Sequence, residues 1–331
     1  MLSKLNSAEV KPESDKAPSE FRDRWTGQFL KHLATDRGAS AYTQRNYSHT
    51  LTEFHRWHLE ERRQAPKWDA LQRDDFRNYV RFLGRHNLSR AAIQLRFSAL
   101  RSFYKFLIRH GTVTGSPIKN IALPKVGKRL PKFLTAKQMS DLLEAPLKFI
   151  PRNEKKKPGR PVEASVCYRD VAILETIYSC GLRISELCRL AAADIDFNEQ
   201  MVRVLGKGKK ERLVPIGQPA LKAIENYWQL LPQPPSGNAP VFLASEKKFQ
   251  PIAPRILQLR LKKYLATAGL DPTLTPHKLR HTYATLMLDA GADLRSVQEL
   301  LGHAHLATTQ VYTHLTTERL KRAYDKAHPR A

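Results

Sequence analysis

The chain has 331 residues and carries 56 Lys and Arg against 31 Asp and Glu, which gives a formal net charge of +25. This length suffices for two average domains with apolar cores, and a mean hydropathy of −0.49 without any run of about 18–20 apolar residues excludes a membrane-embedded protein. A surplus of one charge repels itself in a compact chain, so the composition predicts a polyanionic partner.

The N-terminal residues 1–20 alternate Lys with Glu and Asp and lack the apolar segment of a secretion signal. We expect them to form a polar tail on a cytoplasmic protein. The cysteines agree with this location, because none forms a CxxC pair and isolated thiols in a reducing compartment stay free. They are Cys167, Cys180 and Cys188, and we expect all of them to be buried.

Residues 21–112 are predicted to form a small helical domain that binds DNA. In two segments, Thr43–His58 and Ala91–Arg109, apolar side chains recur every three or four residues, as they do along one face of a helix. We interpret the aromatic residues of these faces as core rather than as platforms for stacking on bases.

Between Asp75 and Asp141 lie 65 residues without a carboxylate, and 14 of them are Lys or Arg. A solvated helix face usually mixes both signs, whereas a run of one sign is unfavourable unless phosphates neutralise it. This run therefore predicts DNA contact. The candidate DNA-binding residues are Arg96, Arg101, Lys105, Arg109, Lys125 and Lys128.

Two stretches are predicted to lack regular structure. Residues 113–132 form a basic linker, because Gly and Pro are frequent there and alternate with Lys and Arg. The second domain then occupies residues 133–331. Within it, the Lys-rich stretch from Pro146 to Pro161 is expected to be an exposed loop, which either contacts DNA or is simply solvated.

In the second domain, a helical pattern begins at Arg169 and is interrupted at Gly181, which is typical of a helix end, and Arg183 then opens the next helix. Alternating residues 201–205 and 212–216 predict a hairpin with a Lys-rich tip. The tip does not match a P-loop, because GxxxxGK[ST] is absent and a strand follows. The fold class is therefore mainly α with a small β-hairpin or sheet in the C-terminal domain.

Another helix is predicted to begin with Thr275 as N-cap and Pro276 at its first position. His277 and Arg280 then share its first turn, where backbone amides also attract a phosphate. We expect this helix to end near Gly291.

Asp293 is predicted to cap one more helix, Leu294–Leu301, that ends at Gly302. An alternative interpretation of this region is a metal site made of histidines. Its ligands would be His277, His281, His303 and His305. Because no Cys or carboxylate stands at ligand spacing nearby, we expect no metal and no cofactor.

The order and spacing of five motifs resemble the catalytic motifs of tyrosine recombinases. They are Gly181-Leu182-Arg183, the Lys207 hairpin, His277-x-x-Arg280, Leu301-Gly302-His303 and Tyr312. Within that family the chain is most similar to the Xer recombinases, on the evidence of residues 206–212, residues 291–298 and the ending from Tyr312 to Ala331. The resemblance implies a two-domain DNA clamp, with a helical core-binding domain followed by an α+β catalytic domain.

The resemblance also implies a role for each motif residue. Tyr312 is the nucleophile that forms a 3′-phosphotyrosyl intermediate, and such covalent storage of the bond needs no external energy. Arg183 and Arg280 bind the phosphate oxygens, which suits two permanently charged bidentate groups. Lys207 protonates the leaving oxygen, His277 moves protons at the tyrosine and His303 hydrogen-bonds the phosphate. We also expect Glu186 to orient Arg183.

The family further implies partners. Recombination takes place in a tetramer on two duplexes, at a short imperfectly palindromic site, and in Xer systems two related recombinases alternate, are activated by a septal DNA translocase and resolve chromosome dimers at cell division. In such tetramers the C-terminal segment of each subunit packs on its neighbour. Here the candidate segment runs from Arg319 to Ala331.

Several alternatives remain open at this point. An integrase of a phage or transposon, or a type IB topoisomerase, would use the same chemistry. A DNA-binding protein of the same fold without catalysis would not need all six motif residues. A metal-dependent nuclease that uses the histidines would be inhibited by EDTA and would form no covalent adduct with DNA.

Overall fold

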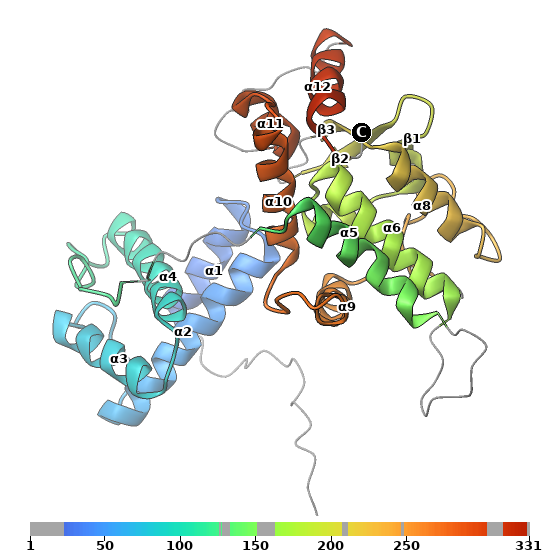
Figure 1. Ribbon diagram of the computed structural model, residues 1–331. Helices are drawn as coiled ribbons and strands as arrows, with labels where there is room; N and C mark the ends of the chain where they lie inside the picture. Colours follow the sequence, from blue (N-terminus) through green and yellow to red (C-terminus); the bar gives the residue numbers. More distant parts are fainter. Residues whose placement is uncertain are drawn as a thin grey trace, which may run out of the picture. The chain divides into compact units, whose positions relative to one another are not determined.

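The computed structural model describes residues 23–125, 127, 133–150, 163–206, 211–245, 248–302 and 314–329. The chain divides into two compact units between Arg129 and Leu130, and each unit has a hydrophobic core of its own (Figure 1). Most described residues are helical, and the strands that are described lie in the second unit, so the predicted fold class is confirmed. None of the described helices combines the length and the apolar character that crossing a bilayer requires.

The first unit is a helical bundle with an aromatic core. Its helices are α1 (Arg24–Thr35), α2 (Ala41–Arg62), α3 (Arg73–Arg85) and α4 (Arg90–Arg109). Ser40 and Ser89 cap α2 and α4 by accepting a hydrogen bond from a backbone N–H of the first turn. Phe54 of α2 packs against Trp68 and Tyr79, with ring centroids 5.4 and 4.9 Å apart. The interpretation of the aromatic residues as core is confirmed.

The predicted linker is partly wrong. From Thr112 to Lys125 the backbone forms no helix or strand, as expected, but Ile118 and Ile121 are buried in the core of the first unit. Arg73 and Gln94 also hold this stretch by donating hydrogen bonds to the carbonyls of Asn120 and Pro124. The Gly and Pro pattern indicated irregular backbone correctly, but the buried isoleucines make this stretch part of the domain. Residue 126 and residues 128–132 lie outside the described residues.

The second unit packs helices around small antiparallel sheets. Its helices are α5 (Ala136–Glu144), α6 (Ala164–Cys180), α7 (Ile184–Leu187), α8 (Gln218–Trp228), α9 (Pro254–Thr267), α10 (Pro276–Asp289), α11 (Leu294–Leu301) and α12 (His314–Ala327), with the 3₁₀ helices η1 (Ala145–Phe149) and η2 (Ala192–Asp194). Its strands are β1 (Ile195–Asp196), β2 (Met201–Leu205), β3 (Glu211–Pro215), β4 (Leu243–Ser245) and β5 (Lys248–Pro251).

The sheets have the order β1-β2-β3 and β4-β5. The predicted hairpin is confirmed as β2 and β3, in which Val202 pairs with Val214 and Leu205 pairs with Glu211. The predicted loop from Pro146 to Pro161 is wrong at its start, because η1 turns there and buries Pro146. Residues 151–162 lie outside the described residues.

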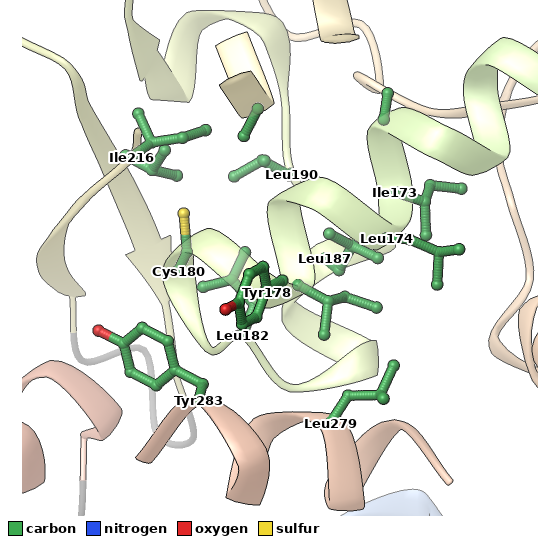
Figure 2. Packing of buried hydrophobic residues seen from close by; sticks show 14 of the residues in the cluster. Ile173, Leu174, Tyr178, Cys180, Leu182, Leu187, Leu190, Ile216, Leu279 and Tyr283 are labelled. Atoms are coloured by element: carbon green, nitrogen blue, oxygen red, sulfur yellow. The ribbon is translucent and has the colours of Figure 1, made fainter. Parts of the chain in front are cut away.

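A sharp corner joins α6 to α7 and places Arg183 at the start of α7. Gly181 ends α6 in the left-handed conformation, with φ = 58°, as its sequence position predicted. A Cβ there would lie 2.6 Å from the Tyr283 ring of α10, so glycine is required by space as well as by φ. Figure 2 shows Leu182 and Leu187 of this corner among the buried side chains, with Leu279 and Tyr283 on the side of α10. Cys180 at the end of α6 is buried, as are Cys167 and Cys188.

The C-terminal helix α12 packs on its own unit in this single chain. Leu320 and Tyr324 are buried, and the Tyr324 hydroxyl lies 2.8 Å from the Ser179 Oγ. His328 is buried too, and its ring stacks on Tyr324 with centroids 4.7 Å apart. The apolar side chains of α12 are buried within the same chain, and packing on a neighbouring subunit remains a prediction of the family resemblance. Arg330 and Ala331 lie outside the described residues.

A buried ionic network ties α6 to α9 and to β4. The Asp170 carboxylate accepts from Arg169 at 3.0 Å, from Arg260 at 2.6 Å and from the Tyr264 hydroxyl at 2.5 Å. Arg169 also donates to the Leu243 carbonyl of β4 at 2.7 Å. The Asp170 side chain is 4% exposed, so both arginines depend on it for neutralisation.

We predict that Asp170→Asn lowers the free energy of unfolding of the catalytic unit by about 3–5 kcal/mol, because it leaves the buried Arg169 and the partly buried Arg260 without their counterion. Urea unfolding of wild type and variant measures this difference. Asp141→Asn, at an exposed position of α5, removes the same charge and should change stability by less than about 0.5 kcal/mol. Equal effects of the two substitutions would contradict the prediction.

Candidate active site

Arg183 stands at the N-terminal end of α7 and is held by the carboxylate of Glu186, one turn further along. Its backbone N–H donates to Glu186 Oε2 at 2.9 Å, and its Nη1 donates to Glu186 Oε1 at 2.7 Å. The Arg183 side chain remains 34% exposed, whereas that of Glu186 is 5% exposed. Glu186 therefore holds the Arg183 guanidinium from the buried side, and part of the Arg183 side chain still reaches solvent. The expected contact between Glu186 and Arg183 is confirmed.

The same carboxylate binds a second arginine that the sequence interpretation missed. Arg212 of β3 donates from Nη1 to Glu186 Oε1 at 3.1 Å and from Nη2 to Oε2 at 2.8 Å. The alternation of residues in β3 could have indicated that Arg212 is buried, because it shares the inward face of the strand with buried Val214. A buried arginine requires a buried carboxylate, and that requirement could have pointed to Glu186.

Arg280 reaches the same place from the first turns of α10. Its Nη1 donates to the Gly181 carbonyl at 2.7 Å and lies 3.8 Å from Glu186 Oε2. Burial and the nearby charge of Arg183 lower the pKa of Arg280 to about 10, although Glu186 opposes that shift. Because a pKa of about 10 still leaves the guanidinium charged at neutral pH, the structure gathers three cations around one carboxylate.

The C-terminal end of α11 supplies the remaining acceptors for these arginines. Three successive carbonyls of its last turn each accept a guanidinium N–H. Leu300 accepts from Arg212, Leu301 from Arg280 and Gly302 from Arg183. These carbonyls have no partner within the helix and form the negative end of its dipole, so they suit cations.

Gly302 is required at this end of α11 for two reasons. It adopts φ = 63°, which ends the helix in the left-handed conformation. A Cβ at this position would also lie 3.1 Å from Cδ and 3.2 Å from Nε of Arg212. The glycine of the Leu301-Gly302-His303 motif therefore allows the close approach of Arg212.

The other proposed catalytic residues are placed less completely. His277 lies at an exposed position in the first turn of α10, on the same helix as Arg280, and His281 of the alternative metal site is also exposed. Thr275 is the N-cap of α10, as predicted, but its side chain makes no capping hydrogen bond, whereas Asp293 caps α11 with its carboxylate. Lys207, His303 and Tyr312 lie outside the described residues, as does His305.

In the first unit, the predicted basic stripe of α4 borders a groove of about 370 Å³. Arg101, Lys105 and Arg109 of α4 line it, as do His32 and Arg37. All three α4 cations are exposed. His32 is bound at 2.6 Å to Asp36, and the hydrogen bond from His32 lowers the pKa of that carboxyl. The groove thus offers several cations to an anion.

The other DNA-binding candidates differ from this stripe. Arg96 lies on α4 but donates two hydrogen bonds to Glu53 of α2, at 2.8 and 3.1 Å, and its side chain is only 21% exposed. This pairing offsets the charge of Arg96 and leaves it less available to a phosphate than the exposed cations of the stripe. Lys125 is exposed, and Lys128 lies outside the described residues.

The ionisation of Glu186 predicts a pH dependence of stability. Burial alone would raise the pKa of this carboxyl, but the hydrogen bonds and charge of Arg212, with those from Arg183, lower it from 4.5 to about 2. A pKa depressed in the folded state stabilises the protein above pH 4.5, and this contribution is lost as the pH falls toward 2.

We therefore expect Glu186→Gln to cost on the order of 3 kcal/mol at pH 7 and progressively less between pH 4.5 and pH 3. Urea unfolding at pH 7, 5 and 3 measures the difference from wild type. Glu225→Gln, at an exposed position of α8, is the matched control and should have little effect at any pH. A cost of Glu186→Gln that is the same at all three values would contradict the assigned ionisation.

Family models match both units of the chain. Residues 132–319 match the phage integrase family, and residues 27–111 match the phage integrase N-terminal SAM-like domain. The chain is 41% identical over 303 residues to the tyrosine recombinase XerC of Alcanivorax borkumensis, covering 92% of this chain and 93% of the relative. It is 39% identical over 307 residues to XerC of Shewanella amazonensis, covering 93% and 96%.

Solved structures share the fold at lower identity. The XerH site-specific recombinase bound to a palindromic difH substrate has a TM-score of 0.63 at 23% identity, covering 90% of this chain and 83% of that one. The integrase of transposon Tn1549 in complex with circular intermediate DNA has a TM-score of 0.62 at 19% identity, covering 89% and 98%. On the family match and the XerC relatives, the chain belongs to the phage integrase family and is a site-specific tyrosine recombinase close to XerC.

Proposed function

We propose that this recombinase cuts and rejoins double-stranded DNA through a 3′-phosphotyrosyl intermediate on Tyr312. One observation carries the proposal: Arg183 and Arg280, far apart in the sequence, are held around the single carboxylate of Glu186, at 2.7 and 3.8 Å. Such a pair suits a phosphodiester, because guanidinium groups bind two phosphate oxygens at once and remain charged.

The charge at this site also favours an anion. Three arginines contribute three positive charges, Glu186 removes one, and the end of the α11 dipole removes roughly half of another. The site therefore keeps a positive excess that a phosphate can neutralise. In the transition state the phosphorus carries more negative charge on its equatorial oxygens, so preorganised cations stabilise it more than the ground state.

In the proposed step, the Tyr312 oxygen bonds to phosphorus as the bond from phosphorus to the 5′-oxygen breaks. The phenol proton leaves through His277, and Lys207 gives a proton to the 5′-oxygen, which departs as a hydroxyl. His303 donates a hydrogen bond to a phosphate oxygen. The reverse attack by a 5′-hydroxyl from another strand restores the diester and frees the tyrosine, so no net bond energy is consumed.

For the first unit, we propose that Arg101, Lys105 and Arg109 bind phosphates of the DNA backbone, with Lys125 and Lys128 at the end of that domain. Support comes from the exposed groove beside the α4 stripe. XerH and the Tn1549 integrase were solved with DNA, and λ integrase was solved as a tetramer on a Holliday junction. We propose a tetrameric synapse for this chain as well.

The proposed cellular role is the resolution of chromosome dimers at cell division, in the cytoplasm, as for XerC-type recombinases. The proposed substrate is a short imperfectly palindromic site. A paralogous recombinase would supply the other two subunits of the synapse, and a septal DNA translocase would activate it. The XerC relatives support this choice over an integrase of a mobile element.

The nucleophile can be tested by covalent trapping. We expect the wild-type protein, in EDTA, to give a slowly migrating DNA adduct on denaturing gels with nicked suicide duplexes of candidate terminus sites. Tyr312→Phe should bind the same duplexes on native gels without forming an adduct. If the wild-type protein forms its adduct only after a paralogous recombinase is added, the paired synapse is supported. Cleavage that depends on a divalent metal would refute the mechanism.

The basic stripe predicts a salt-dependent loss of affinity. Replacing Arg101, Lys105 and Arg109 together by Gln should weaken DNA binding and reduce the slope of log affinity against log salt by about 0.9 for each phosphate that the protein no longer neutralises. Titrations by fluorescence anisotropy at several salt concentrations measure both. The matched control replaces the three exposed arginines at the same spacing on α3, which are Arg77, Arg81 and Arg85. An equal loss of affinity in both triple variants would show that only the net charge of the protein matters, and it would refute the assigned surface.

A further inference from the structure

We propose that Arg212 is a positioning residue for strand transfer: it fixes the Glu186 carboxylate in the orientation that aims the Arg183 guanidinium at the scissile phosphate. The inference rests on the proposed function and assigns a role to a residue that is not among the six proposed catalytic residues. Arg212 is 6% exposed, so it acts through its neighbours and not by touching DNA.

The contacts of Arg212 determine how Glu186 can lie. Its guanidinium binds both carboxylate oxygens, at 3.1 and 2.8 Å, and its Nε donates to the Leu300 carbonyl at 3.1 Å. The plane of the carboxylate is therefore set by a fork that is itself fixed to α11. Glu186 then presents Oε1 to the Arg183 side chain and Oε2 to the Arg183 backbone N–H.

Arg212 also joins the two structural elements on either side of Glu186. It starts from β3, and its Nε binds the last turn of α11, one residue before the carbonyl that Arg280 uses and two before the one that Arg183 uses. Gly302 leaves room for this approach, since a Cβ would press on Cδ, Nε and Cζ of Arg212. The three arginines and α11 thus form one hydrogen-bonded unit.

Stability alone does not account for a buried arginine at this position. Removing two charges from water costs free energy that a buried ion pair often fails to recover, and a well-packed apolar side chain is commonly as stable. Val214 on the same face of β3 is such a residue. The advantage of Arg212 is geometric, because a bidentate arginine fork fixes the orientation of a carboxylate.

The test is the single-turnover rate of adduct formation on a suicide duplex, with protein in excess. Arg212→Gln should bind DNA as wild type does but form the adduct about 10–100-fold more slowly, as is usual when a group that orients a reacting residue is removed. Arg212→Lys keeps the charge without the fork and should be slower than wild type by at least about threefold. Wild-type rates in both variants would overturn the proposal.

A double-mutant cycle separates positioning from a general loss of folding. If Arg212 acts through Glu186, the double variant Arg212→Gln, Glu186→Gln should be no slower than the slower single variant. Effects that multiply would show that the two residues act independently. Arg203→Gln, on the adjacent strand β2, removes an exposed arginine bound to Asp194 and should leave the rate within about twofold.

A duplex with sulfur in place of the 5′-bridging oxygen tests which part of the reaction is affected. A thiolate leaves without a proton, because thiols are far more acidic than alcohols, so defects in leaving-group protonation disappear on this substrate. The slow adduct formation of Arg212→Gln should persist, because Arg183 must still bind the scissile phosphate in the correct orientation. Full recovery would overturn the proposal. Absence of any wild-type adduct, with a paralogous recombinase present as well as without it, would instead refute the proposed function itself.

Discussion

The active site depends on a single arrangement of opposite charges: one buried carboxylate and the open end of one helix hold three arginines. Without Glu186 and the last carbonyls of α11, the guanidinium groups of Arg183, Arg212 and Arg280 would repel each other. Their attraction to these acceptors brings together a corner between two helices, a strand and the start of a third helix. Much of the catalytic unit can be understood as the support for this cluster, because α6, α10 and the sheet place its members.

Both units separate the charges that hold the fold from the charges left for a ligand. In the catalytic unit, Asp170 and Glu186 neutralise arginines that are mostly buried, while Arg183 keeps a third of its side chain exposed. In the first unit, Glu53 neutralises Arg96, and the stripe of Arg101, Lys105 and Arg109 faces a groove. The arginines and lysines named above therefore fall into two groups: those whose charge a carboxylate balances within the fold, and those that keep exposed charge for the proposed DNA substrate.

Sequence periodicity predicted the helices and the hairpin well where one face is buried. The boundaries of α4, the corner at Gly181 and the cap at Asp293 all follow from local rules that hold whatever the rest of the chain does. Local rules failed where contacts with residues distant in the sequence determine which side chains are buried. Ile118 and Ile121 lie in a segment rich in Gly and Pro, yet they complete the core of the first unit.

By itself, the sequence determined the family, the order of the two units and the residue types that the chemistry needs, because motif spacing and helical periodicity are properties of the chain. Tertiary structure alone decided which arginines pair with which carboxylates. Arg96 and Arg101 look alike on one helix, and Arg212 looks like any strand arginine, until folding brings Glu53 to the first and Glu186 to the last. The strength of such pairs depends on distance and burial, and neither is determined by position along the chain.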